Sequence, residues 1–97
     1  MSEIILERIY TVPLRDAYEA SRRRRAKRAI NILREFAERH MKSEDVRISE
    51  GVNRLIWGRG AEKPPRKITV MMRKDKDGIV RIMLPEEAGK EEGKKEH

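Results

Sequence analysis

The stretch Ser21–Lys42 constrains the fold more than any other, because its apolar residues recur at the spacing of an α-helix. From Ala26 onward they return at every third or fourth position, which places them in one stripe along a helix. Phe36 and His40 lie at one edge of this stripe. We therefore predict a firm helix from about Arg25 to Met41 that packs its apolar side on a core. The stripe consists of Ala26, Ala29, Ile30, Leu33, Ala37 and Met41.

The same helix begins with a concentration of positive charge. Six of the eight residues in Ser21–Arg28 are arginine or lysine. Each cation at a helix N-terminus costs roughly a few tenths of a kcal/mol, because that end already carries partial positive charge. A sequence that served only the fold would place Asp or Glu there, so we predict that an anionic partner offsets the cost. The alternative interpretation is a charged face that only contacts water.

The helical geometry divides these cations into two groups. At about 100° per residue, Arg24, Lys27 and Arg28 point away from the apolar stripe. In a regular helix, Arg22 and Arg23 would instead rotate toward the stripe. We therefore expect this pair to leave the helix and to extend into solvent as loop.

The segment before the helix carries two competing start signals. Asp16 and Glu19 have the spacing of a capping box, which would start the helix early. Ser21 is an equally good N-cap for a later start. We predict irregular or weakly helical chain over Arg15–Ser21.

The first predicted strand is Glu3–Leu14, which is rich in β-branched residues. Both of its faces carry apolar residues, with Ile5 and Ile9 on one of them. Apolar residues on both faces are more typical of a central strand than of an edge strand. Pro13 ends the strand because it has no N–H to donate to a sheet.

The rest of the chain predicts four shorter elements, from alternating apolar residues and from turn and cap signals. Gly58 and Gly60 can end a helix, and Gly78 can take a positive φ in a hairpin turn. The predicted elements are a strand at Asp45–Ser49, a helix at Glu50–Trp57, strands at Ile68–Lys74 and Ile79–Leu84, and a turn at Asp75–Gly78.

This order of elements predicts an α+β fold. We expect a small, mostly antiparallel sheet with one long and one short helix packed on one face. The chain of 97 residues is long enough for one domain, which we assign to residues 1–84. The remaining residues, 85–97, are charged and have no apolar periodicity, so they are predicted to form a disordered, flexible tail.

The charge of the chain indicates its class of partner. The net charge is +7, and residues 85–97 hold three lysines and five glutamates, so residues 1–84 carry +9. A small domain this basic needs a polyanion, most commonly nucleic acid. An acidic membrane surface is the rival, but no apolar run is long enough to cross a bilayer and the basic helix has no Trp on its apolar face. We expect no membrane insertion.

The sequence predicts neither catalysis nor a cofactor or metal site. There is no cysteine, which excludes disulfides, zinc–thiolate sites and thiol catalysis. His40 lies at the helix edge, and no Ser or Thr has the context of a catalytic nucleophile. The acids are scattered, and the Gly58–Gly60 segment is not a phosphate loop.

A second basic cluster lies in WGRGAEKPPRK, Trp57–Lys67. Arginine forks bind phosphates in bidentate fashion, and the glycines let the backbone approach a partner closely. Trp57 could stack on a base, but with only one Trp, one Phe and two Tyr in the chain we favour a place in the core. Because no helix-turn-helix is predicted, contact with phosphates and RNA shape suits this chain better than reading base edges.

Four segments together resemble the ribosomal protein thirty-one family of the archaeal and eukaryotic large ribosomal subunit. The likeness spans about Glu7 to Leu84, whereas the SRRRR run and the tail are where such proteins vary. The segments are ERIYTVPLR at Glu7–Arg15, RAKRAINILREF at Arg25–Phe36, VNRLIW-x-RG at Val52–Gly60 and KPPRKI at Lys63–Ile68.

The resemblance implies an α+β fold and a structural constituent of the cytoplasmic ribosome that binds large-subunit rRNA. It also implies a place near the exit of the nascent-chain tunnel, beside neighbouring ribosomal proteins and factors that meet emerging polypeptides. A DNA-binding chromatin or architectural protein remains the alternative. The first candidate phosphate-binding patch consists of Arg22, Arg23, Arg24, Arg25, Lys27 and Arg28, extended by Arg15 and, if its strand face is exposed, by Arg8; the second consists of Arg59, Lys63, Arg66 and Lys67.

Overall fold

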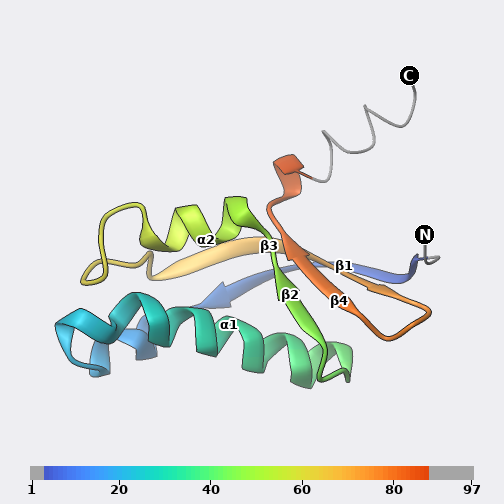
Figure 1. The fold of residues 1–97 in the computed structure, drawn as a ribbon, viewed down its shortest axis with the longest axis horizontal. Helices are drawn as coiled ribbons and strands as arrows, with labels where there is room; N and C mark the ends of the chain where they lie inside the picture. The colour runs from blue at the N-terminus through green and yellow to red at the C-terminus, as the bar shows by residue number, and fades with distance from the viewer. Residues whose placement is uncertain (1–3, 88–97) are drawn as a thin grey trace.

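A four-stranded sheet with two helices on one face makes up the fold of residues 4–87, the part of the chain that the computed structural model describes (Figure 1). The strand order is β1-β3-β4-β2, in which only the β2–β4 pair is parallel. The predicted α+β class with a mostly antiparallel sheet is therefore confirmed. The elements are β1 (Ile4–Pro13), the 3₁₀ turns η1 (Arg15–Glu19) and η2 (Arg22–Arg24), α1 (Arg25–Met41), β2 (Val46–Ile48), α2 (Glu50–Trp57), β3 (Lys67–Asp75) and β4 (Val80–Met83).

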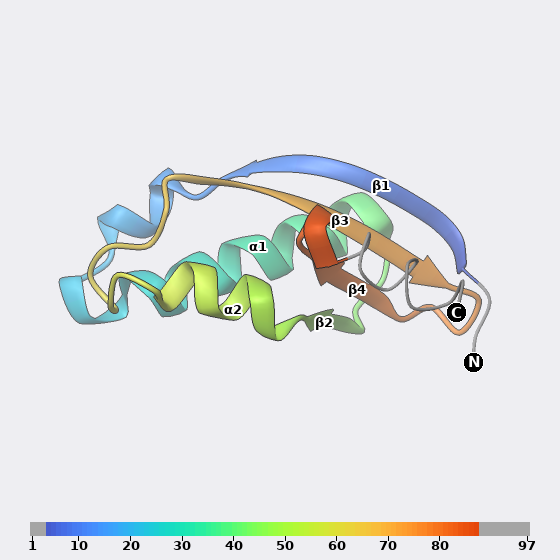
Figure 2. The same cartoon turned by 90° about the horizontal axis from the view of Figure 1, so that it is seen from above.

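The core lies between the apolar stripe of α1 and the sheet. Five of the six predicted stripe residues are buried, and Ile30 packs partly buried at the edge. Alternate residues of β3 and β4 face this stripe, and α2 completes the core with Val52 and Ile56. Figure 2 shows β1 and β3 along one side of the molecule and both helices along the other. The buried residues include Ala26, Ala29, Leu33, Ala37 and Met41 from α1, and Ile68, Val70, Met72, Val80 and Ile82 from the sheet.

Contrary to the prediction of a central strand, β1 is an edge strand. It pairs with β3 alone, with Val12 opposite Ile68 and Ile9 opposite Met71. Ile5 and Ile9 are 60% and 59% exposed, because no described element covers that face of β1. Apolar residues on both faces therefore do not indicate a central position in this sheet.

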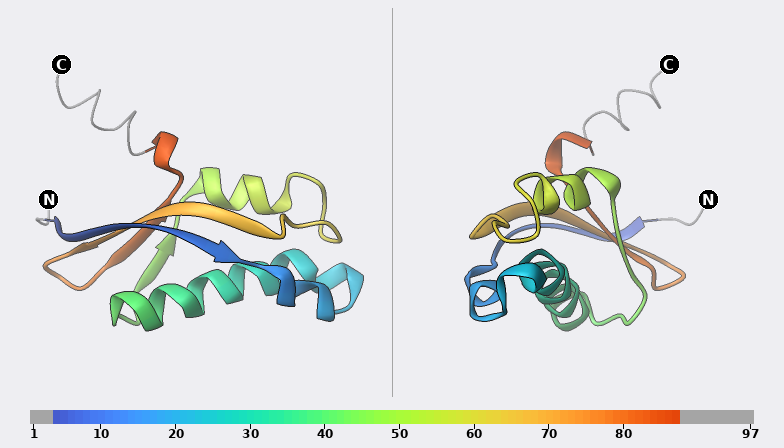
Figure 3. Two further views of the ribbon diagram at one scale, coloured as in Figure 1. Left: turned by 180° about the vertical axis from the view of Figure 1, so that it is seen from behind. Right: turned by 60° about the vertical axis from the view of Figure 1, so that its left-hand side comes forward.

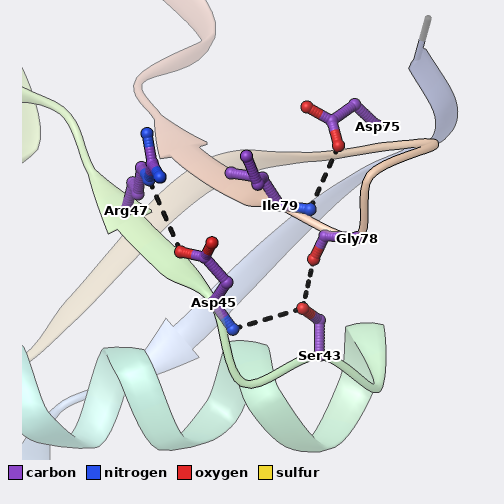
Figure 4. A network of polar contacts seen from close by, with 6 residues as sticks. All are labelled: Ser43, Asp45, Arg47, Asp75, Gly78 and Ile79. Atoms are coloured by element: carbon purple, nitrogen blue, oxygen red, sulfur yellow. Dashed lines mark hydrogen bonds and ion pairs between the residues drawn. The ribbon is translucent and has the colours of Figure 1, made fainter. Parts of the chain in front are cut away.

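The β3–β4 hairpin forms as predicted and is fixed to the loop after α1 (Figure 4). Gly78 has a φ of 85°, and the buried Asp75 carboxylate accepts the Ile79 N–H at 3.1 Å. Ser43 donates its hydroxyl to the Gly78 carbonyl and accepts the Asp45 N–H at 3.3 Å. These bonds join the hairpin turn to the connection between α1 and β2.

Residues 85–87 lie beyond the predicted domain boundary at Leu84 and are also described by the structure. Ser49 caps α2 by accepting the Val52 N–H at 3.2 Å, and its hydroxyl donates to Glu87 Oε1 at 2.7 Å. The same Glu87 oxygen accepts the Leu84 N–H at 3.0 Å. Residues 85–87 thus contact the fold, whereas the rest of the predicted tail, residues 88–97, lies outside the described residues.

His40 has a packing role at the edge of the stripe, as expected. Its ring stacks on Phe36 with centroids 3.9 Å apart and meets the edge of Tyr10 at 5.4 Å. Its Nδ1 lies 3.0 Å from the Phe36 carbonyl oxygen. This arrangement joins the last turns of α1 to β1.

Truncating the centre of the stripe tests this packing. We expect Leu33→Ala, at a fully buried site, to lower the free energy of unfolding by ~2–5 kcal/mol, because it leaves a cavity between α1 and the sheet. Thermal melts would measure the loss. The exposed neighbour Arg34 provides the control, since Arg34→Ala should change stability by no more than about 0.5 kcal/mol. An unchanged melting temperature for Leu33→Ala would contradict the packing described here.

Candidate nucleic-acid interface

The arginine run lies where the chain enters α1. The α-helix begins at Arg25 and ends at Met41, which are the predicted bounds. Arg22 and Arg23 leave the α-helix as expected, but they form the 3₁₀ turn η2 rather than open loop. Their side chains and that of Arg24 are exposed. The turn therefore presents three consecutive guanidinium groups to solvent.

The second basic cluster meets the start of α1 at one end of the molecule. Ala26 donates its N–H to the Ala61 carbonyl at 2.9 Å, and Leu14 donates to the Arg66 carbonyl at 2.7 Å. The loop between α2 and β3 thus supplies an acceptor to one of the first N–H groups of α1. Figure 3 shows η1, η2, the start of α1 and this loop gathered at the same end.

Tyr18 of η1 connects the two clusters. Its hydroxyl donates to the Pro64 carbonyl at 2.6 Å. The guanidinium carbons of Arg25 and Arg66 lie 4.9 Å and 4.7 Å from the centre of its ring, within the range of cation–π attraction. Arg25 Nη1 also donates to the Glu62 carbonyl, at 3.4 Å. One aromatic ring therefore holds an arginine from each predicted patch.

Two hollows in the surface are each lined by cations from residues 15–25 and from the loop between α2 and β3. The first hollow has no acidic side chain in its lining, whereas the second contains Asp16. Arg25 of the first predicted patch and its extension Arg15 therefore share one surface with the second patch, and we call this surface the cationic end. The first hollow is lined by Tyr18, Arg25, Arg59, Lys63, Pro64, Pro65 and Arg66, and the second by Pro13, Arg15, Asp16, Arg66 and Lys67.

Few of these cations are neutralised by the protein. Among residues 4–87, Arg28 alone of the twelve candidates forms an ion pair, with Glu35 at 3.9 Å, and both side chains are largely exposed. Such an exposed pair contributes little to stability. Elsewhere in the fold Arg73 lies 3.4 Å from Glu7, with its side chain buried. The cationic end thus keeps its positive potential.

The structure does not bring every candidate into the hollows, and Arg22, Arg23 and Arg24 of η2 line neither of them. Arg8 is exposed but lies midway along β1, opposite Met72, and lines neither hollow. Lys27 and Arg28 are exposed on the first turn of α1, as their angular positions predict, and they also lie outside both hollows. Their charges add to the field of the cationic end without lining it.

The predicted place of Trp57 in the core is wrong. Its side chain is 41% exposed, because Val52 and Ile56 occupy the inner face of α2 and Trp57 is turned about 100° from Ile56. Gly60 has a φ of 91° and donates its N–H to the Trp57 carbonyl at 2.8 Å. This turn places Arg59 two residues after an exposed indole.

Sequence reasoning missed the role of Tyr18. No local pattern singles it out, because its hydrogen-bond partner Pro64 lies 46 residues further along the chain and Arg66 lies beyond that. The helical angles used to place Arg24 outward could also have predicted the exposure of Trp57, had they been applied to α2.

Two other kinds of feature, a metal-binding cluster and a membrane-spanning helix, are absent from the described part of the chain. Within residues 4–87, no group of three or more His, Asp or Glu side chains is placed to hold a metal ion. No helix in this range is long and apolar enough to span a membrane.

The fold and this surface define a small α+β protein with one strongly cationic end. The family model for ribosomal protein L31e matches residues 5–78. A protein of Methanopyrus kandleri named large ribosomal subunit protein eL31 is 55% identical over 86 residues, which are 89% of this chain and 100% of the relative. Proteins of the same name from Hyperthermus butylicus and Pyrobaculum arsenaticum are 47% and 46% identical, over 90% and 84% of this chain and 90% and 91% of their own lengths.

The chain therefore belongs to the ribosomal protein L31e family. This family is of a structural rather than an enzymatic kind, and its members work in translation as constituents of the cytoplasmic ribosome.

Proposed function

We propose that this protein is a non-catalytic constituent of the large ribosomal subunit that binds rRNA through its cationic end. The observation that carries the proposal is the convergence of two basic segments, far apart in the sequence, on one surface that the protein leaves almost without ion pairs. The relatives are named as large-subunit proteins, which supports the same assignment.

The physical basis of binding is neutralisation of the RNA backbone. Each phosphate that pairs with Arg or Lys releases condensed counterions, so affinity falls steeply as the salt concentration rises. Arginine forks add geometric fit, because they can hold two oxygens of one phosphate. The N-terminus of α1 contributes further positive potential from its aligned peptide groups. These interactions bind RNA through its shape and charge rather than its sequence.

Trp57 offers a second kind of contact. Its indole is 41% exposed and directly precedes the turn that carries Arg59. Aromatic side chains beside cations commonly stack on unpaired RNA bases. We include Trp57 in the proposed interface on this ground.

The proposed position in the subunit is near the exit of the nascent-chain tunnel. Neighbouring ribosomal proteins, and factors that meet emerging polypeptides, are the partners proposed for the surface away from the rRNA. The exposed Ile5 and Ile9 on the outer face of β1 are apolar groups available for such contacts.

The alternative is a DNA-binding chromatin or architectural protein, since it would use the same charges. Filter binding at matched salt would separate the two, with full-length protein against duplex DNA and against transcribed large-subunit rRNA fragments of Methanopyrus kandleri. We expect clearly tighter binding to at least one rRNA fragment. Near-equal affinity for DNA and for all RNA fragments would favour the alternative.

Removing two outward-facing cations tests the interface. We expect Arg24→Ala with Arg28→Ala to weaken binding to that rRNA fragment and to flatten the plot of log affinity against log salt. The slope should fall by roughly one unit for each phosphate that the protein no longer neutralises. The matched control is Arg34→Ala with Arg39→Ala, which removes the same charge from exposed positions nearer the other end of α1. Equal effects of both pairs, or none from the first, would exclude Arg24 and Arg28 from the interface.

The absence of cysteine in the sequence gives a direct test of the proposed position. Ile5→Cys would introduce one thiol at an exposed site on the outer face of β1. In purified ribosomes, we expect a short-arm crosslinker at this thiol to capture an emerging chain or a bound nascent-chain factor. Arg59→Cys, at the cationic end, should instead be shielded by rRNA. Capture of neither partner by Ile5→Cys, in ribosomes that carry nascent chains, would contradict a place at the exit.

A further inference from the structure

We propose that Tyr18 is a positioning residue of this interface, and that the hollow beside it takes one phosphodiester group of the RNA backbone. Tyr18 orients Arg25 and Arg66 before RNA binds, so that both guanidinium groups can approach the same phosphate. The inference rests on the proposed rRNA binding and names the site at which the backbone is held most closely.

The first observation is that one ring attracts two like charges from different parts of the chain. Arg25 belongs to α1 and Arg66 to the loop before β3, yet their guanidinium carbons lie 4.9 Å and 4.7 Å from the centre of the same ring. The negative face of an aromatic ring attracts a guanidinium. The ring thus gives both side chains a common attractive partner.

The ring is itself held in place. Its hydroxyl donates to the Pro64 carbonyl at 2.6 Å, and Pro64 is fully buried. Two successive prolines, Pro64 and Pro65, restrict the backbone that carries this acceptor. The half-buried ring therefore has little freedom to move. A fixed ring can hold its two arginines in fixed positions.

The arginines keep donors for a ligand. Of the five N–H donors of Arg25, one donates to the Glu62 carbonyl, at the long distance of 3.4 Å. Its Nε is buried and out of reach of a ligand, so the donors that remain for one are those on Nη1 and Nη2. A phosphate oxygen is a strong acceptor for a guanidinium. The protein thus holds the Arg25 guanidinium in position without providing acceptors for all of its donors.

The lining of the hollow matches a phosphate. Arg59 and Lys63 add two more cations, and no acidic side chain lines this hollow. The neighbouring hollow, by contrast, contains the Asp16 carboxylate beside its cations. The hollow at Tyr18 is therefore the more favourable place for an anion. Because its side chains are ordered beforehand, binding loses less conformational entropy there.

The test compares Tyr18→Leu, which removes the ring, with Tyr18→Phe, which keeps the ring and loses the hydroxyl. Full-length proteins would be titrated against the tightest-binding rRNA fragment in filter assays over a range of KCl concentrations. We expect Tyr18→Leu to weaken binding about tenfold and to lower the salt slope by roughly one to two units, because two arginines then hold the phosphate less closely. Tyr18→Phe should keep the slope and lose less affinity.

A double-mutant cycle separates positioning from a general effect on stability. In a background of Arg25→Ala with Arg66→Ala, Tyr18→Leu should have no further effect on binding, because the groups it orients are gone. Melting curves would show that each variant is folded at the assay temperature. If Tyr18→Leu does not fold, the test uses Arg66→Lys in its place. Lysine keeps the charge but has no planar fork, so we then expect weaker rRNA binding at an unchanged salt slope.

The outcomes distinguish this inference from the function on which it rests. Salt-independent or absent rRNA binding by the unmodified protein would remove the proposed function itself. Normal rRNA binding together with an unchanged slope and affinity for Tyr18→Leu would overturn only the role of Tyr18. An equal fall in slope for the Phe and Leu variants would show that the hydroxyl, not the ring, is responsible, and would also overturn it. Full rRNA affinity of Arg66→Lys would likewise overturn the role of Tyr18.

Discussion

The packing of the α1 stripe on the sheet is the interaction on which the rest of the structure depends. Five buried side chains from Ala26 to Met41 fix both the position and the rotation of the helix. Because that rotation is fixed, Lys27 and Arg28 face solvent, and Arg24 is exposed in the turn just before the helix. The same packing sets the N-terminus of α1 beside the loop that carries Arg59 and Arg66. One apolar contact thus determines where the charge of the molecule is presented.

The concentration of arginines at the cationic end costs stability. Arginines repel one another and oppose the field of the helix N-terminus, and the fold accommodates them with local contacts rather than with acids. Tyr18 lies against Arg25 and Arg66, and the Ala61 carbonyl accepts an N–H of the first helical turn. These contacts order the segment but leave its charge in place. An RNA backbone would supply the missing counter-charge.

Elements that depend on local pattern were predictable, and features that depend on distant neighbours were not. The bounds of α1 and α2, the hairpin turn at Gly78 and the departure of Arg22 from the helix follow from periodicity, capping and backbone freedom. The edge position of β1 did not follow, because it depends on what the rest of the chain covers. The exposure of Trp57 could have followed from its angular position on α2, but its apolar character favoured the core. Burial of an apolar side chain is favourable, but the side chain stays exposed where no other part of the chain packs over it.

The sequence alone determined which residues form helices and strands, that the helix start is densely basic, and to which family the chain is related. Only the tertiary structure decided that parts of both basic clusters share one surface and that Tyr18 connects them. The reason is the range of the interactions involved. Helical periodicity acts between near neighbours in the chain, whereas the contact between Tyr18 and Pro64 spans 46 residues and exists only once the sheet and α1 have packed.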